Sequence, residues 1–238
     1  MKIKKEQIAG GNYQYTKLPL DSFIRSMQKL DVHKIEFYAA SPHLYVWDYT
    51  PSEVWEIKRK LDHAGIEVVC FTSEQCIYPV SIAIDDYHVR ERSLRYYERA
   101  LEQAAILGSP YMQMISGSGY LHSDPAEDLK RSTDGIYRLT KKAREVGVTI
   151  VLEADRTCTV GNTKQQIEMI KEINDPYFSG MIDTNAVWHA KEDFEEDVKL
   201  LGKDLRHIHF IDINEGGGCL IPGSGFLPMG DYLEILAK

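Results

Sequence analysis

The feature that most constrains the fold of this chain is a regular alternation of two kinds of segment. Seven short runs rich in β-branched and aromatic residues are each followed by a longer segment whose apolar residues recur with helical periodicity. No two strand-like runs are consecutive. This order is typical of βαβ units, in which parallel strands form one sheet and helices cover it. We therefore predict an α/β protein with a parallel sheet.

The predicted elements follow one another at short intervals. The strands are expected over residues 7–9, 34–38, 66–72, 111–116, 148–153, 180–183 and 207–212. The helices are expected over residues 20–30, 51–61, 85–107, 125–146, 164–173 and 194–201, and another begins near Met229. Asp124 before Pro125 indicates a helix start, and Gly108 and Gly147 indicate helix ends.

The length of the repeat favours a barrel. Each strand and helix together take roughly 30 residues, as in a (β/α)8 TIM barrel of about 250 residues. A doubly wound sheet is the alternative, but no G-x-G-x-x-G follows the first strand, where Gly10, expected to close that strand, and Gly11 occur. We predict a single TIM-barrel domain over residues 1–238. Seven units do not close a barrel, so an eighth strand and helix are expected to be missing, with a naturally open barrel as the alternative.

Composition limits the partners and the compartment. The 238 residues carry a formal net charge of -8, which argues against a nucleic-acid partner, because phosphate binding draws on excess Lys and Arg. No apolar run approaches the ~18 residues of a membrane span, and the charged N-terminus lacks a signal-peptide core. The cysteines are scattered without a C-x-x-C pair, at Cys70, Cys76, Cys158 and Cys219. We predict a cytoplasmic protein and leave homo-oligomerisation open.

Three consecutive predicted strands end in residues that can bind a metal ion. They supply Glu153, Asp183 and the pair His207 and His209, with Asp212 at the end of the last strand. One acid at a strand end is usually a helix cap, but the C-terminal ends of barrel strands carry catalytic groups, so these side chains can converge. Mixed oxygen and nitrogen donors suit Mn²⁺, Co²⁺, Fe²⁺ or Mg²⁺. His207 and His209 share one face, and we predict His209, nearer the strand end, as the ligand.

These residues resemble the sugar phosphate isomerase/epimerase superfamily of xylose isomerase-like TIM barrels. Within it, the chain is most similar to fructoselysine 3-epimerase-like proteins, and the resemblance extends over essentially the whole sequence. Its most specific element is R-H-I-H-x-x-D at 206–212, with the upstream Glu153 and Asp183. Further support comes from Ile35-Glu36, Ser41-Pro42-His43, Thr72-Ser73-Glu74, Tyr78-Pro79 and residues 221–225.

The resemblance implies a role for each of these residues. Glu153, Asp183 and His209 correspond to metal ligands, with Mn²⁺ as the first choice, and Glu153 is also catalytic. Substrate contacts are expected from His43, Glu74, His207 and Asp212. The family's fourth ligand, a Glu ending the eighth strand, has no counterpart here. Ala186 and Glu215 stand where tagatose and psicose 3-epimerases carry His and Arg, which favours the fructoselysine-like branch or another branch of the superfamily without an assigned activity.

The implied activity is a sugar epimerase or isomerase acting on a small-molecule sugar or sugar derivative. A carboxylate removes a proton next to a carbonyl, and a divalent metal stabilises the resulting enediolate. A ketose or fructosamine-type 3-epimerase is the leading hypothesis. An aldose-ketose isomerase, an inosose-type dehydratase and a catalytically incomplete sugar-binding barrel stay open as alternatives. The charge of -8 and the few strand-end histidines argue against an apurinic endonuclease of the same fold.

Overall fold

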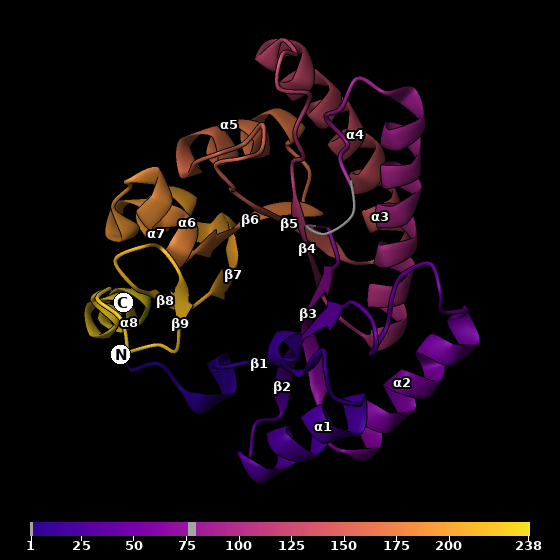
Figure 1. Ribbon diagram of the computed structural model, residues 1–238, viewed down its shortest axis with the longest axis vertical. Helices are drawn as coiled ribbons and strands as arrows, with labels where there is room; N and C mark the ends of the chain where they lie inside the picture. The colour runs from indigo at the N-terminus through magenta and orange to yellow at the C-terminus, as the bar shows by residue number, and fades with distance from the viewer. Residues whose placement is uncertain (1, 76–79) are drawn as a thin grey trace.

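Seven parallel strands form one sheet in the order of the chain. The computed structural model describes residues 2–75 and 80–238, so Cys76, Tyr78 and Pro79 lie outside the described residues. The strands are β1 (Gly10–Gly11), β2 (Lys34–Ala39), β3 (Glu67–Ser73), β4 (Tyr111–Ile115), β5 (Thr149–Glu153), β6 (Phe178–Asp183) and β7 (Leu205–His209). Each pairs in parallel with the next, and the sheet curls around an interior (Figure 1). The predicted α/β barrel architecture is confirmed.

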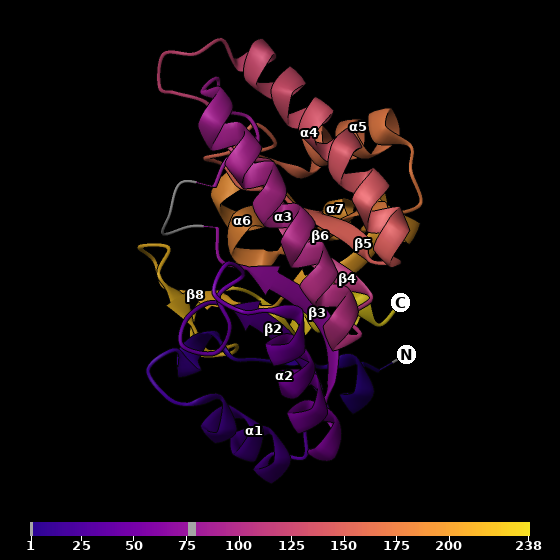
Figure 2. The same cartoon turned by 90° about the vertical axis from the view of Figure 1, so that its right-hand side faces the viewer.

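Helices follow the strands and cover the outer face of the sheet (Figure 2). They are α1 (Leu20–Lys29), α2 (Pro51–His63), α3 (Tyr87–Leu107), α4 (Pro125–Val146), α5 (Thr163–Ile173), α6 (Thr184–Ala190), α7 (Phe194–Leu201) and α8 (Met229–Leu236). The predicted helix signals are confirmed: Asp124 accepts the backbone N–H of Ala126, and Gly108 and Gly147 end α3 and α4 at φ of 77° and 75°.

The main core lies between the outer face of the sheet and the helices. In β2, Ile35, Phe37 and Ala39 are fully buried, and Phe37 stacks on Phe71 of β3. Glu36 alternates with these residues, so its side chain lies on the opposite, inner face. This strand thus directs apolar side chains toward the helices and Glu36 toward the interior of the curled sheet. A smaller apolar cluster in that interior consists of Cys70, Val151 and Met181.

The predicted first strand was misplaced. Residues 7–9 do not form a strand: Lys5–Gln7 is a short 3-10 helix, and the strand is Gly10–Gly11. Close packing explains why Gly10, which was predicted to close the strand, lies within it. A Cβ on Gly10 would lie 2.4 Å from the sulfur of Met27 in α1, so a side chain at this position would require Met27 to move.

The predicted seventh strand was too long. The strand ends at His209, and Asp212 belongs to a separate antiparallel hairpin formed by β8 (Asp212–Ile213) and β9 (Cys219–Leu220). The helix α6 was not predicted, since it is short and its N-cap is the strand-end residue Asp183, which accepts the N–H of Asn185 at 2.7 Å. Both differences place extra structure at the C-terminal ends of β6 and β7.

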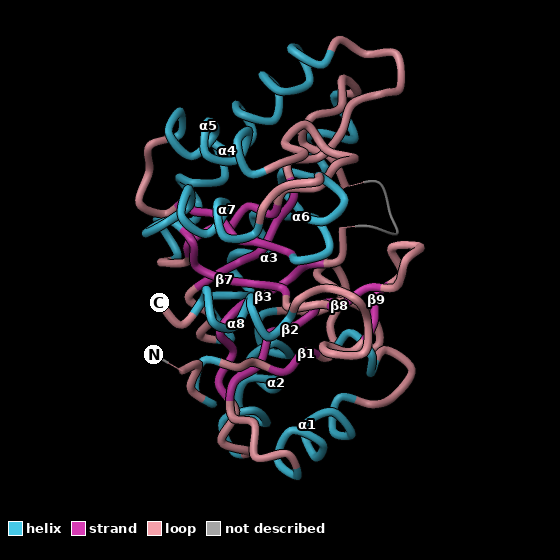
Figure 3. The backbone as a smooth tube through the Cα atoms, turned by 90° about the vertical axis from the view of Figure 1, so that its left-hand side faces the viewer, coloured by secondary structure: helices cyan, strands magenta, loops and turns pink. Residues whose placement is uncertain are grey.

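The two ends of the chain lie on the same side of the molecule, near α8 (Figure 3). In the part of the chain that the structure describes, no strand pairs β1 with β7. No helix within the described ranges has both the length and the apolar character required to cross a membrane. Cys70, Cys158 and Cys219 are free thiols.

Candidate functional site

The C-terminal ends of β5, β6 and β7 bring Glu153, Asp183 and His209 together, as predicted. In the sheet register, Asp183 lies opposite His209, and Glu153 lies opposite Met181. His209 Nδ1 lies 3.3 Å from Glu153 Oε1 and 3.6 Å from Asp183 Oδ2. One ligand atom from each residue falls within 4.8 Å of the others. The three side chains therefore form a compact group of oxygen and nitrogen donors.

Glu36 reaches the same histidine from the opposite wall of the curled sheet. Its Oε1 and Oε2 lie 2.9 and 3.1 Å from His209 Nε2, and Oε2 lies 2.8 Å from His207 Nε2. Strands β3 to β6 separate β2 from β7 in the sheet, so these bonds cross the interior. The sequence pointed to Glu36 only through the dipeptide Ile35-Glu36, which supports the family resemblance. An acid between Ile35 and Phe37 in a predicted strand was the signal that identifies it as an inward-facing residue.

A chain of side-chain amides fixes the position of Glu153. Gln113 of β4 donates to Glu153 Oε2, and Gln75 donates to Gln113 at 2.5 Å. Tyr97 of α3 in turn donates to Gln75 at 2.6 Å. Gln75, Gln113 and Tyr97 are buried and were not predicted as site residues. Their bonds hold one Glu153 oxygen and leave the other facing His209.

The donor set fits a divalent metal ion. The side chains of Glu153, Asp183 and His209 are 14%, 13% and 20% exposed, so they are sheltered yet reachable from the strand ends. Two carboxylates and one imidazole suit ions of intermediate hardness, and no sulfur ligand takes part. Glu36, His207 and His209 form a second group of candidate ligands that shares His209. The two ring nitrogens of His209 face different groups.

The two carboxylates beside His209 differ in their electrostatic environment. Burial raises the pKa of Glu153, and the charge of Asp183 adds to this, while His209 opposes it. Burial also acts to raise the pKa of Glu36, but the charge of His209 and hydrogen bonds from His207 and His209 outweigh it. The pKa of Glu36 therefore lies well below its usual range. Burial lowers the pKa of His209, yet Glu36 and Glu153 together raise it well above normal. Glu36 thus acts as the anionic partner of the imidazole, and Glu153 holds a proton more readily.

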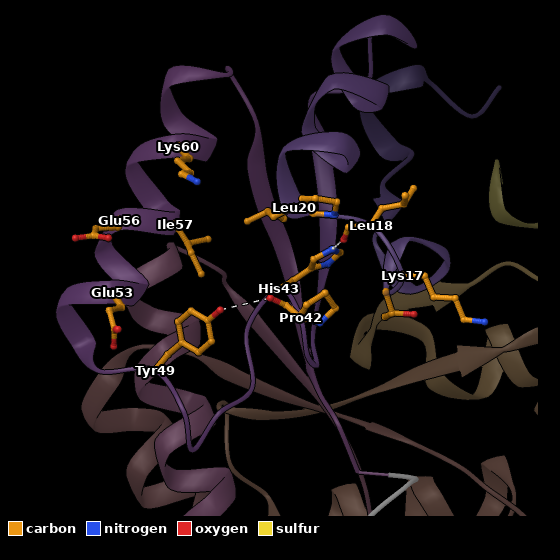
Figure 4. A pocket seen from close by; sticks show the side chains of 12 residues that line it. Lys17, Leu18, Leu20, Pro42, His43, Tyr49, Glu53, Glu56, Ile57 and Lys60 are labelled. Atoms are coloured by element: carbon orange, nitrogen blue, oxygen red, sulfur yellow. Dashed lines mark hydrogen bonds between the residues drawn. The ribbon is translucent and has the colours of Figure 1, made fainter.

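His43, a predicted substrate contact, lies away from this group. It lines a cavity of about 620 Å³ between α2 and the segment that leads into α1 (Figure 4). Its Nε2 donates to the carbonyl of Leu18 at 2.8 Å, so its Nδ1 accepts from the Asn12 amide, also at 2.8 Å. Both ring nitrogens therefore have partners within the protein, and a substrate contact stays a prediction.

Asp212, a second predicted substrate contact, organises a loop. Its fully buried carboxylate accepts four backbone N–H groups, from Ile213, Gly223, Gly225 and Leu227, at 2.7 to 3.1 Å. Burial works against its ionised form, but these donors outweigh burial and lower the pKa of Asp212. The observed contacts are structural, and contact with a substrate stays a prediction.

Of the two other predicted substrate contacts, His207 lies beside the candidate metal group, and Glu74 lies at the end of β3. His207 is bonded to Glu36, and its ring lies 5.6 Å from that of His209 in an edge-on arrangement. Glu74 directly follows β3, is 6% exposed, and its carbonyl accepts the hydroxyl of Tyr96 at 2.7 Å. Their roles toward a substrate remain predictions.

Comparison with known proteins identifies relatives over nearly the whole chain. The model of a family described as xylose isomerase-like TIM barrel matches residues 24–238. Fructoselysine 3-epimerases of Escherichia coli O157:H7 and Shigella flexneri are each 23% identical over 225 residues. These alignments cover 92% of this chain and 82% and 81% of the respective relatives.

Solved structures with low sequence identity share the fold. A D-tagatose 3-epimerase-like protein has a TM-score of 0.83 at 18% identity, covering 100% of this chain and 86% of its own. The 3-keto-D-glucoside 4-epimerase of E. coli has a TM-score of 0.81 at 16% identity, covering 97% and 87%. An IOLI protein with a bound zinc atom has a TM-score of 0.78 at 18% identity, covering 100% and 84%. These likenesses confirm the predicted TIM-barrel fold.

Proposed function

Because the chain belongs to the xylose isomerase-like TIM barrel family, we propose that it is a sugar epimerase dependent on a divalent metal ion. The observation that carries this proposal is the convergence of Glu153, Asp183 and His209 at the ends of three neighbouring strands. The fructoselysine 3-epimerases, at 23% identity, support a ketose or fructosamine as the substrate class. Carbon 3 of such a sugar is the proposed site of reaction.

The proposed reaction removes a proton from a carbon next to a carbonyl and returns a solvent-derived proton to the opposite face of the same carbon. A divalent ion held by Glu153, Asp183 and His209 supplies positive charge that favours loss of this proton. Glu153 is the proposed base, because its carboxylate lies at the end of β5 beside His209, within the group proposed to hold the metal ion and the substrate carbonyl. Gln113 fixes one Glu153 oxygen by a hydrogen bond, so the other oxygen keeps its direction toward the interior.

Mn²⁺ is the metal we propose, with Co²⁺, Mg²⁺ and Fe²⁺ as alternatives. Two carboxylates match the preference of Mn²⁺ and Mg²⁺ for oxygen, and the imidazole favours the transition metals over Mg²⁺. The zinc atom in the IOLI structure makes Zn²⁺ a necessary competitor in the same test. Calorimetric titration of the metal-free protein with each ion ranks the candidates.

Proton exchange with solvent tests the activity. Ketoses and fructosamines are incubated in D₂O with the Mn²⁺-loaded protein, and deuterium at carbon 3 is followed by NMR. We expect incorporation with wild type and a loss of about 100-fold or more with Glu153→Gln, because a general base contributes this much. Glu145→Gln, at a surface position 69% exposed, is the matched control and should behave as wild type.

The same spectra separate the competing reactions. Deuterium at carbon 1 or 2 with a shifted carbonyl indicates an aldose-ketose isomerase, and loss of a hydroxyl group indicates a dehydratase. Either pattern in place of exchange at carbon 3 overturns the epimerase proposal. Equal exchange by wild type and Glu153→Gln removes Glu153 as the base.

A further inference from the structure

The buried carboxylate of Glu36 contacts the side of His209 that faces away from Glu153 and Asp183. We propose that Glu36 is a positioning residue, which keeps the proton on His209 Nε2 and thereby leaves the Nδ1 lone pair to bind the metal ion. This inference rests on the proposed function, because it assumes a metal ion held by Glu153, Asp183 and His209. It adds a residue on β2 to a site otherwise built from β5, β6 and β7.

The distances assign a different task to each ring nitrogen of His209. Nε2 lies 2.9 and 3.1 Å from the two Glu36 oxygens, whereas Nδ1 lies 3.3 Å from Glu153 and 3.6 Å from Asp183. A ring nitrogen that donates its proton to a carboxylate has no lone pair left for a metal. The ligating atom must then be Nδ1, which already lies beside the two other proposed ligands.

The contacts of Glu36 favour a hydrogen-bond acceptor over a second metal ligand. Thr72 donates to Oε1, and His207 donates to Oε2 at 2.8 Å. With His209, three donors converge on one carboxylate, so its lone pairs are largely occupied. A second ion between Glu36, His207 and His209 would have to displace these bonds.

The backbone of Glu36 is held firmly enough to orient a neighbouring ring. Its flanking residues Ile35 and Phe37 are fully buried in the main core, and Glu36 pairs with Cys70 in the adjacent strand. The imidazole of His209 is therefore held between two walls of the sheet. Carboxylates that hold a metal-binding histidine in this way typically contribute about 10- to 100-fold to metal affinity.

Two measurements test the role of Glu36. In the Zn²⁺-loaded protein labelled with ¹⁵N-histidine, NMR should show His209 protonated at Nε2 and metal-bound at Nδ1. Glu36→Gln preserves size but removes the charge, and calorimetry with Mn²⁺ should show affinity lower by roughly tenfold or more. Asp197→Asn, a buried acid of α7 outside this site, is the control and should bind Mn²⁺ as wild type does.

The outcomes separate this inference from the proposed function. A His209 ring protonated at Nδ1 in the Zn²⁺-loaded wild type overturns the inference, and this spectrum needs no folded variant. Wild-type affinity in a folded Glu36→Gln also overturns it. Asp183→Asn tests the metal site itself, because unchanged Mn²⁺ affinity in that variant defeats the proposed function. If Asp183→Asn loses Mn²⁺ affinity while Glu36→Gln binds Mn²⁺ normally, only the role of Glu36 is defeated.

Discussion

At the scale of single residues, His209 joins two carboxylates that have different chemical properties. Glu36 accepts hydrogen bonds from two imidazoles and a hydroxyl, which stabilise its charge. Glu153 receives one amide donor, and its burial and then the neighbouring Asp183 disfavour its charge, although His209 favours it. Environment alone therefore separates two glutamates into an anionic anchor and a stronger base. The geometry of the histidine decides which of them faces the proposed metal.

Asp197 is a buried acid whose ionisation should cost stability. Burial and the nearby Glu192 raise the pKa of Asp197 to about 6, although a bond from Thr163 opposes this. The folded protein thus keeps this proton up to about pH 6, whereas the unfolded chain releases it near 3.8. Folding takes up a proton between these values, so stability falls as the pH rises from 3.8 to about 6 and stays lower above.

Asp197→Asn should therefore raise the melting temperature at pH 7 and leave it unchanged below pH 3.8. Thermal denaturation followed by circular dichroism at several pH values measures this difference. Glu196→Gln, at an exposed position of the same helix, is the control and should show no such dependence. The argument would be contradicted if the melting temperature of Asp197→Asn minus that of wild type were smaller at pH 7 than at pH 4.

Residues of the site differed in how readily the sequence revealed them. Glu153, Asp183 and His209 stand at strand ends, where chain order alone predicts convergence. Glu36 and Gln113 lie inside strands, and their contacts depend on the curl of the sheet and on side chains far along the chain. Sequence periodicity shows that such residues face the interior of the sheet, but it does not show which side chains they contact.

At the scale of elements, the hairpin after β7 is the part that periodicity missed. Its strands have two residues each, too short for any alternation to appear. The four backbone donors around Asp212 hold the segment that follows, from Ile213 to Leu227. The conformation of such a loop depends on one buried hydrogen-bond acceptor and on glycine positions where the backbone packs closely. Neither feature produces a periodic pattern in the sequence.

Gly225→Ala tests this packing. A Cβ at Gly225 would lie 2.2 Å from the carbonyl oxygen of Ile213 and 2.4 Å from Asp212 Oδ1, so backbone and carboxylate must both move. We expect a loss of about 1–3 kcal/mol of unfolding free energy, measured by urea denaturation. Gly230→Ala in α8 has open space and should be neutral or stabilising by up to about 1 kcal/mol. Equal stability of wild type and Gly225→Ala would show that the loop adjusts without cost.

At the scale of the whole molecule, the number and order of the seven strands followed from the alternation of segments. The position of β1 did not, because it consists of glycines that a pattern assigns to turns. The curl of the sheet is a collective result of strand twist and helix packing, so it becomes visible only through contacts such as Glu36 with His207. The proposed metal site depends on this curl, and binding of an ion there should in turn stabilise the curled sheet.

Metal binding should therefore raise the melting temperature of the whole protein. The proposed ligands come from three strands and are assembled only in the folded state, so an ion at 100 times its Kd adds about 2.7 kcal/mol. For a chain of this size, that corresponds to a rise of roughly 5–10 °C. Mn²⁺ should produce the rise in wild type, and EDTA should reverse it.

Asp183→Asn is the matched variant for this experiment. Asparagine can still cap α6 by accepting the N–H of Asn185, so the helix is retained while the ligand charge is lost. The metal-free variant should melt close to metal-free wild type, and Mn²⁺ should shift it by less than about 2 °C, because the affinity is lost and little binding free energy remains. An equal Mn²⁺-dependent shift in both proteins would mean that the ion stabilises the fold from another site.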